Sequence, residues 1–255
     1  MHIALTGNLG SGKSTIAKIM AEKFGYTIYS TGKIQRELDE ERGLTVLEMN
    51  KLMQQDHSFD NIIDEKVTQL SKESKEELFF DSRLAWHFAE NAFKVFLSVS
   101  IDEAARRVYN DDKRGDVEKY TSQADAKANL IERARTEDER YKEIYGLDYF
   151  NLNNYDLVLD STFSKPELLA EVLINEKKRY ENLIAENKKP TSRILLAPCR
   201  LLGANAGNTR DNDDIFDSSV VIERGAEDIV VVSGMDQIEK ASREGYEFIS
   251  VSYMG

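Results

Sequence analysis

The sequence predicts an α/β fold in which a parallel sheet is flanked by helices. Short apolar runs alternate with longer helical patterns along residues 2–189, as expected for strands joined by crossover helices. In addition, the first apolar run, residues 2–6, leads directly into a glycine-rich loop and then into a helix. This strand, loop and helix unit is the usual opening of a nucleotide-binding sheet.

The remaining elements follow in order along the chain. A helix with apolar residues at helical spacing covers 14–24, and strands are expected at 26–29, 78–80, 94–99 and 155–159, with charged helical stretches between them. A helix rich in Glu and Lys follows from about residue 165. Residues 188–192 contain Pro and small polar residues and look like a linker. We therefore expect two domains, residues 1–187 and 193–255.

The glycine-rich loop carries the clearest chemistry. Residues 7–15 read Gly-Asn-Leu-Gly-Ser-Gly-Lys-Ser-Thr, a complete phosphate-binding loop of the Walker A type. Its glycines allow successive backbone N–H groups to cradle a β-phosphate at the positive end of the helix dipole. A chance glycine-rich turn is the alternative, and the flanking strand and helix disfavour it. The expected ATP-binding residues are Gly7, Asn8, Leu9, Gly10, Ser11, Gly12, Lys13, Ser14 and Thr15.

Composition favours a cytoplasmic enzyme. A single cysteine, Cys199, excludes an intramolecular disulfide framework and fits a reducing compartment. No apolar run is long enough to cross a membrane, and residues 1–12 form a strand and a loop rather than a signal peptide. The formal net charge of −12 disfavours nonspecific binding of nucleic acid by the whole surface. We expect neither a membrane nor a nucleic acid as a partner.

Polar residues that follow the strands are candidates for the rest of the site, because ligands of such sheets bind at the carboxyl ends of the strands. Ser30, Gly32 and Arg36 follow the second strand and could bind a phosphate or ribose, although a capped helix with an exposed Arg explains them too. Asp81 ends the third strand, where it can orient water on Mg²⁺, and Arg83 is placed to grip an acceptor phosphate.

Arginines on two later helices could form a mobile flap over the phosphates. Arg106 lies on the first helix, and Arg133 and Arg140 lie on the second. Guanidinium groups in such a flap stabilise charge on a transferring phosphoryl group. Ion pairing on the helix surface is the alternative for each of them, because several Glu and Asp residues stand three or four positions away.

These motifs together resemble the cytidylate kinases, in particular the compact archaeal type of nucleoside-monophosphate kinase. The resemblance covers residues 1 to about 175 and includes the loop, three aspartates at 56, 60 and 64, and the segments 81–85, 94–97, 140–148 and 155–158. It implies transfer of a phosphoryl group from ATP, with Mg²⁺, to CMP or dCMP. Two departures stand out: Ser82 replaces a glycine that is usual in the family, and Ala134 replaces a glutamate.

The resemblance also implies a role for each matching position. Lys13 and Ser14 would serve ATP and Mg²⁺, and Asp81 would hold water on the metal. The roles of the other residues fall into two groups. The acceptor would be bound by Ser30, Gly32, Arg36, Asp60 and Arg83. The catalytic cations would be Lys13, Arg83, Arg106, Arg133 and Arg140.

Residues 194–253 resemble the small fold shared by ParB-type partitioning proteins and sulfiredoxin. Strands are expected at 194–197, 228–234 and 248–252, with a helix at 236–244. Where that family carries an Arg for phosphate, this chain has Gln237, so CTP hydrolysis and DNA binding are not carried over. A structural or regulatory appendage that could contact a protein partner through residues 190–255 is the expectation.

Two functions from different classes therefore stay open. The first is an active nucleoside-monophosphate kinase, or a kinase for another small molecule, which the intact loop with Lys13 and Ser14 favours. The second is a nucleotide-binding regulatory protein with a slow or inactive kinase fold, which Ser82 and Ala134 favour.

Overall fold

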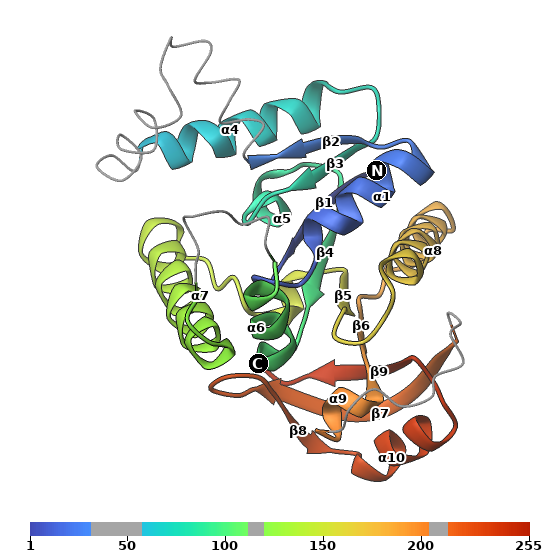
Figure 1. Ribbon diagram of the computed structural model, residues 1–255. Helices are drawn as coiled ribbons and strands as arrows, with labels where there is room; N and C mark the ends of the chain where they lie inside the picture. Colours follow the sequence, from blue (N-terminus) through green and yellow to red (C-terminus); the bar gives the residue numbers. More distant parts are fainter. Residues whose placement is uncertain (32–57, 112–119, 204–213) are drawn as a thin grey trace.

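The described residues form a nine-stranded sheet, in the order β2-β3-β1-β4-β5-β6-β9-β7-β8 (Figure 1). The computed structural model describes residues 1–31, 58–111, 120–203 and 214–255. Its first five strands, in sheet order, are all parallel. They are β2 (Thr27–Ser30), β3 (Leu78–Asp81), β1 (His2–Gly7), β4 (Ala92–Ser98) and β5 (Leu157–Asp160). The predicted α/β class is confirmed, and each predicted strand of this region is present.

Helices cover both faces of this parallel part. On one face α1 (Lys13–Phe24) and α8 (Pro166–Ala185) enclose a core with alternate residues of β1, β4 and β5, such as Leu5, Val95 and Leu157. On the other face lie α5 (Ala85–Phe88) and the segment around the short η2 turn (Leu152–Asn154), which contact Phe96 and Val158. The alternation of two cores along each strand follows from the period of two in a pleated strand.

Three further helices complete the N-terminal part that the structure describes. They are α4 (Ser58–Glu73), α6 (Ile101–Tyr109) and α7 (Gln123–Tyr145), and α6 packs against α7 through Ala105 and Leu130 (Figure 1). Ser100 and Ser122 cap α6 and α7, each accepting a hydrogen bond from the backbone N–H three residues on. In the described ranges no helix is long and apolar enough to cross a bilayer.

The C-terminal residues extend the same sheet. Strand β6 (Arg193–Leu196) pairs in parallel with β5, and β9 (Phe248–Tyr253) pairs with β6 in the antiparallel direction. The sheet continues through β7 (Ile215–Arg224) to β8 (Ile229–Ser233), while α9 (Pro198–Leu201) and α10 (Met235–Arg243) pack on it. Strand β7 was not predicted.

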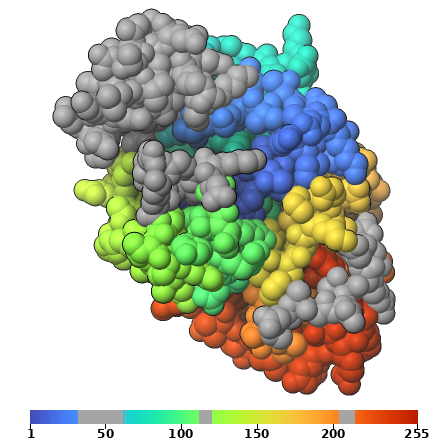
Figure 2. All heavy atoms as spheres, viewed as in Figure 1, coloured from blue at the N-terminus to red at the C-terminus, as the bar shows by residue number. Residues whose placement is uncertain are grey.

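One hydrophobic core crosses the expected domain boundary. It joins Phe96 and Tyr155 of the N-terminal part to Ile194, Ile222 and Ile249 of the C-terminal part. On the face drawn in Figure 2, the orange and red C-terminal atoms meet the green atoms of α6 and α7 directly. The division at residues 187–193 stays a prediction, and the shared sheet and core argue against independent folding of the second part.

Candidate active site

The loop between β1 and α1 has the backbone of a phosphate cradle. Gly7, Gly10 and Gly12 have φ of 149°, 76° and 91°, conformations that residues with a side chain rarely adopt. A Cβ atom at Gly7 would lie 2.2 Å from the carbonyl oxygen of Leu97, so the loop leaves β1 in contact with β4. The Asn8 Oδ1 accepts a hydrogen bond from the Val99 N–H at 3.2 Å and fixes this path.

Lys13 begins α1 and turns back over the loop. Its Nζ donates to the carbonyl oxygens of Gly7 and Asn8, both at 3.0 Å. Ser14 and Thr15 follow in the first turn and are exposed, whereas Ser11 is buried and its Oγ has no hydrogen-bond partner. The positions of Gly7 to Thr15 thus fit the predicted nucleotide cradle, with a cation at its centre.

Asp81 stands at the carboxyl end of β3, opposite Leu5 of β1 and Ser30 of β2 in the sheet register. Burial raises the pKa of Asp81 above its usual value of 3.8, while Lys13 and Arg83 act in the opposite direction. The three charged groups therefore lie close enough to influence one another. In the described segments no three His, Cys, Asp or Glu side chains are grouped so that they could hold a metal ion by themselves.

Arg83 is fixed against the loop. Its Nη1 donates to the Gly7 carbonyl oxygen at 2.5 Å and to the Tyr149 hydroxyl at 3.2 Å, and its Nε pairs with Glu137 of α7 at 3.3 Å. The Tyr149 hydroxyl also donates to the Gly7 carbonyl oxygen at 2.8 Å. The structure thus brings Arg83, Lys13 and Asp81 together at the mouth of the loop.

A cavity of about 480 Å³ opens beside the other end of the loop. Gly12, Thr15, Arg107 and the segment 161–166 after β5 line it. Arg107 connects these parts: its guanidinium donates to the carbonyl oxygens of Ser161 at 2.5 Å and Thr162 at 3.2 Å, and to that of Gly10 at 3.3 Å. The Ser161 Oγ in turn donates to the Ser11 carbonyl oxygen at 2.8 Å.

Sequence reasoning missed these last residues. Ser161 and Thr162 follow β5 directly, so the rule of polar residues at strand ends, applied to the other strands, could have found them. Arg107 could not be separated from Arg106 by sequence alone. Both arginines pair with Glu103 at 2.7 Å, but the phase of α6 turns Arg107 toward the loop, where it bonds the Gly10 and Ser161 carbonyl oxygens, whereas Arg106 is more exposed.

The other two flap arginines lie on α7. Arg133 pairs with Glu137 at 3.2 Å, which is the surface pairing given above as the alternative. Arg140 is half-buried. A role for Arg106, Arg133 and Arg140 in catalysis stays a prediction.

The predicted acceptor residues are only partly described. Ser30 ends β2 beside Asp81. Gly32 and Arg36 lie outside the described residues, and Asp60 belongs to α4 with a side chain outside what is described. The Tyr145 hydroxyl donates to the Asp64 Oδ2 at 2.7 Å and so links α7 to α4.

The C-terminal segment reaches the same edge of the sheet through Arg200. Its Nη1 donates to Ser98 Oγ and Asp160 Oδ1, both at 2.9 Å, at the carboxyl ends of β4 and β5. Its Nη2 pairs with Asp228 at 2.5 Å. Asp160 also accepts from the Thr162 N–H at 3.0 Å, and Thr162 lines the cavity beside Gly12 and Arg107.

A parallel sheet with this loop, and with Lys13, Asp81 and Arg83 at its mouth, defines a phosphate-binding loop protein of the kinase type. The model of the Cytidylate kinase-like family matches residues 2–163, and the chain belongs to that family.

Individual proteins agree with this assignment. The chain is 33% identical over 196 residues to a cytidylate kinase of Haloarcula marismortui, covering 76% of this chain and 98% of the relative. It is equally identical over 201 residues to an S-adenosylmethionine-dependent nucleotide dehydratase of Lacinutrix mariniflava, covering 78% of this chain but only 40% of that protein. A crystal structure of an uncharacterized protein from Eubacterium ventriosum superposes with a TM-score of 0.53 at 15% identity, covering 69% of this chain and 96% of that one, which shows the fold alone.

Proposed function

We propose that this protein transfers the γ-phosphoryl group of ATP to a nucleoside monophosphate, with CMP or dCMP as the preferred acceptor. The observation that carries the proposal is that Lys13 and Arg83 both bond the Gly7 carbonyl oxygen of a complete loop, while the buried Asp81 lies close enough to feel both charges. Membership of the cytidylate kinase-like family supports the acceptor class. The named cytidylate kinases among the relatives support cytosine as the base.

Each residue has a part that its position supports. The loop N–H groups and Lys13 would hold the β- and γ-phosphates, and the donor-side cavity beside Arg107 would take the base of ATP. Mg²⁺, with the Ser14 hydroxyl and water on Asp81, would neutralise phosphate charge. Arg83 would hold the acceptor phosphate in line, with its guanidinium fixed by Tyr149 and Glu137. No general base is required, because a nucleoside monophosphate is already ionised at neutral pH.

An ADP-release assay tests the proposal. The acceptors are CMP, dCMP, UMP, AMP, GMP and, as small alcohols, shikimate and glycerol, each with ATP and Mg²⁺. We expect release above the ATPase background with CMP or dCMP and at least tenfold less with the others, since a base is selected by hydrogen bonds. Loss of release with Lys13→Ala, but not with Lys18→Ala on the exposed side of the same helix, would assign it to the loop.

A regulatory nucleotide-binding role is the second candidate. The ion pairs of Arg106 with Glu103 and of Arg133 with Glu137 favour it, since they hold two flap arginines on their own helices. Under that role, ATP binds to the loop and Lys13→Ala weakens this binding, yet no acceptor releases ADP.

A further inference from the structure

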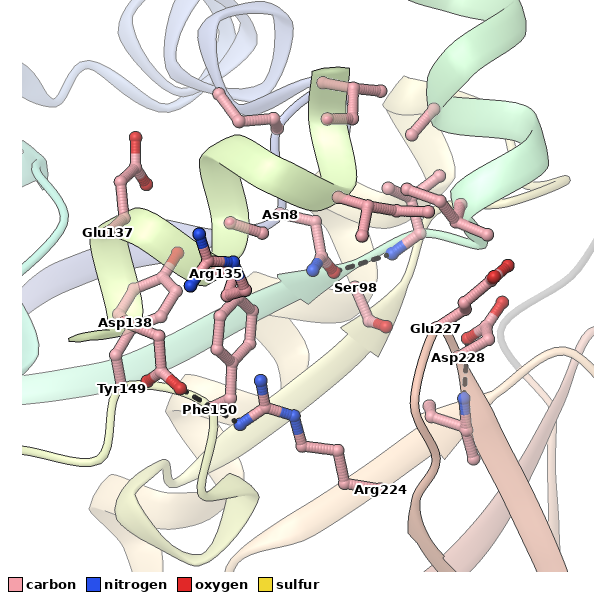
Figure 3. A pocket seen from close by; sticks show the side chains of 18 of the residues that line it. Asn8, Ser98, Arg135, Glu137, Asp138, Tyr149, Phe150, Arg224, Glu227 and Asp228 are labelled. Atoms are coloured by element: carbon pink, nitrogen blue, oxygen red, sulfur yellow. Dashed lines mark hydrogen bonds and ion pairs between the residues drawn. The ribbon is translucent and has the colours of Figure 1, made fainter. Parts of the chain in front are cut away.

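A second cavity, of about 410 Å³, lies between the N-terminal and C-terminal parts of the chain. Its walls are α7, the carboxyl end of β4 with the adjacent loop residues Asn8 and Leu9, and the β7–β8 hairpin (Figure 3). The family match ends at residue 163, so the Arg200 and Arg224 side of the cavity lies beyond it. This cavity is separate from the donor-side cavity around Gly12 and Thr15, because the two have no lining residue in common.

Two buried polar groups in the cavity wall have no hydrogen-bond partner among the residues that the structure describes. They are the Oδ1 of Asp138, whose side chain is 10% exposed, and the Nε of Arg200, whose side chain is 6% exposed. The other polar atoms of both side chains are engaged: Asp138 Oδ2 with Lys142 and Arg224, and the two Nη atoms of Arg200 with Asp160 and Asp228. Buried polar groups are nearly always satisfied, so a ligand that shifts either side chain slightly would supply its missing partner.

The rest of the lining favours a flat, uncharged ligand. Tyr149, Phe150 and Tyr253 supply ring surfaces, and the Arg224 guanidinium carbon lies 4.3 Å from the centre of the Phe150 ring. In Figure 3 the Arg224 side chain extends from the hairpin toward Asp138. Five cationic and five carboxylate side chains line the cavity, so their charges balance. A charged ligand would add a buried charge without a counter-charge, which costs free energy.

We propose that this cavity is a binding site for an uncharged heteroaromatic ligand of nucleoside size. An N–H or O–H of the ligand donates to Asp138 Oδ1, and a carbonyl or ring nitrogen accepts from Arg200 Nε. The ring packs against the aromatic wall beside Phe150. The proposed ligand goes beyond the two substrates of phosphoryl transfer, and its cavity shares Asn8 and Leu9 with the phosphate-binding loop and Arg83 with the proposed acceptor site.

Calorimetry on the full chain tests the site independently of catalysis. The protein is first saturated with a non-hydrolysable ATP analogue and CMP, and is then titrated with adenosine, cytidine, guanosine and uridine in turn. We expect at least one nucleoside to bind in addition, at one site per chain. Binding that occurs only without the analogue and CMP would place the nucleoside in the substrate sites and overturn the proposal.

Three variants locate the binding. Ala134→Phe fills the cavity from α7 and should weaken nucleoside binding about tenfold or more, whereas Ala128→Phe on the exposed side of the same helix should not change it. Asp138→Asn keeps the shape but removes the charge of the acceptor, and should weaken binding several-fold even where the Phe variant fails to fold. The proposal is wrong if no nucleoside binds the saturated protein, or if every folded cavity variant binds like the parent chain.

Discussion

Replacing Arg200 with Met should destabilise the whole chain strongly. The Arg200 side chain is 6% exposed and bridges Asp160, which is fully buried, to Asp228. Without the guanidinium, Asp160 keeps its hydrogen bonds from Thr162 and Ala197 but loses its counter-charge. Removal of one partner from a buried ion pair costs about 3–5 kcal/mol, and the retained hydrogen bonds place this case near about 3 kcal/mol.

Urea unfolding followed by circular dichroism measures this effect. With a slope of about 3 kcal/mol per molar urea, the midpoint should fall by about 1 M. Arg243→Met, at an exposed position of α10, is the matched control and should leave the midpoint within about 0.2 M, as expected for a surface change. Adding Asp160→Asn to the Arg200 variant should restore part of the loss, because the buried charge is then gone. A loss below about 1 kcal/mol in the single variant would refute the reasoning.

Three further predictions follow from the site and the shared core. Asp81→Asn should abolish phosphoryl transfer and yet be at least as stable as the parent chain at pH 7. Burial raises the pKa of Asp81 in the folded protein, so the ionised carboxylate lowers the free energy of unfolding above the folded pKa, and this loss disappears below the unfolded pKa. Urea titrations of both chains at pH 7 and pH 4 measure the difference in stability. A variant that is less stable than the parent chain at pH 7 would contradict the argument. Arg107→Met should raise the KM for ATP about tenfold or more, because it releases the 161–162 segment. Arg106→Met should lower kcat alone if that residue acts in the flap. Steady-state kinetics separate the two variants, and equal effects on KM would place both residues in the ATP site. A chain ending at residue 189 should lose cooperative unfolding, because Phe96 and its neighbours would lose their cover from β6 and β9; a sharp thermal transition of that fragment would instead support two separable domains.

The sequence located the glycine-rich loop between its strand and helix because the signals are local. The loop motif, the buried strand before it and the helix after it lie within 24 residues, and each is read from neighbouring residues. Asp81 and Arg83 were found because parallel strands end at one edge of a sheet, so a polar residue after a strand is informative wherever the strand lies.

The missed parts depend on pairings between distant segments. Strand β7 has polar residues at 217–219 in its centre, and its register with β9 shifts between Phe216 and Val220, which hides the alternation of a strand. Arg200 gave no signal, since its partners Asp160 and Asp228 lie 40 and 28 positions away in sequence. Residues 188–192 do form a loop between α8 and β6, as their composition indicates. Composition does not show whether the strand after such a loop joins the preceding sheet, as β6 does here.

The place of β9 in the sheet bears on how the molecule assembles during synthesis. Residues 248–253 lie between β6 and β7, although they are made after both. Until they emerge, β6 and the β7–β8 hairpin each present an open edge with unpaired backbone groups, the kind of edge that recruits other chains. The risk of aggregation is therefore greatest when residues 193–247 have been made and β9 has not, and a chaperone that covers these edges would protect the chain at that stage.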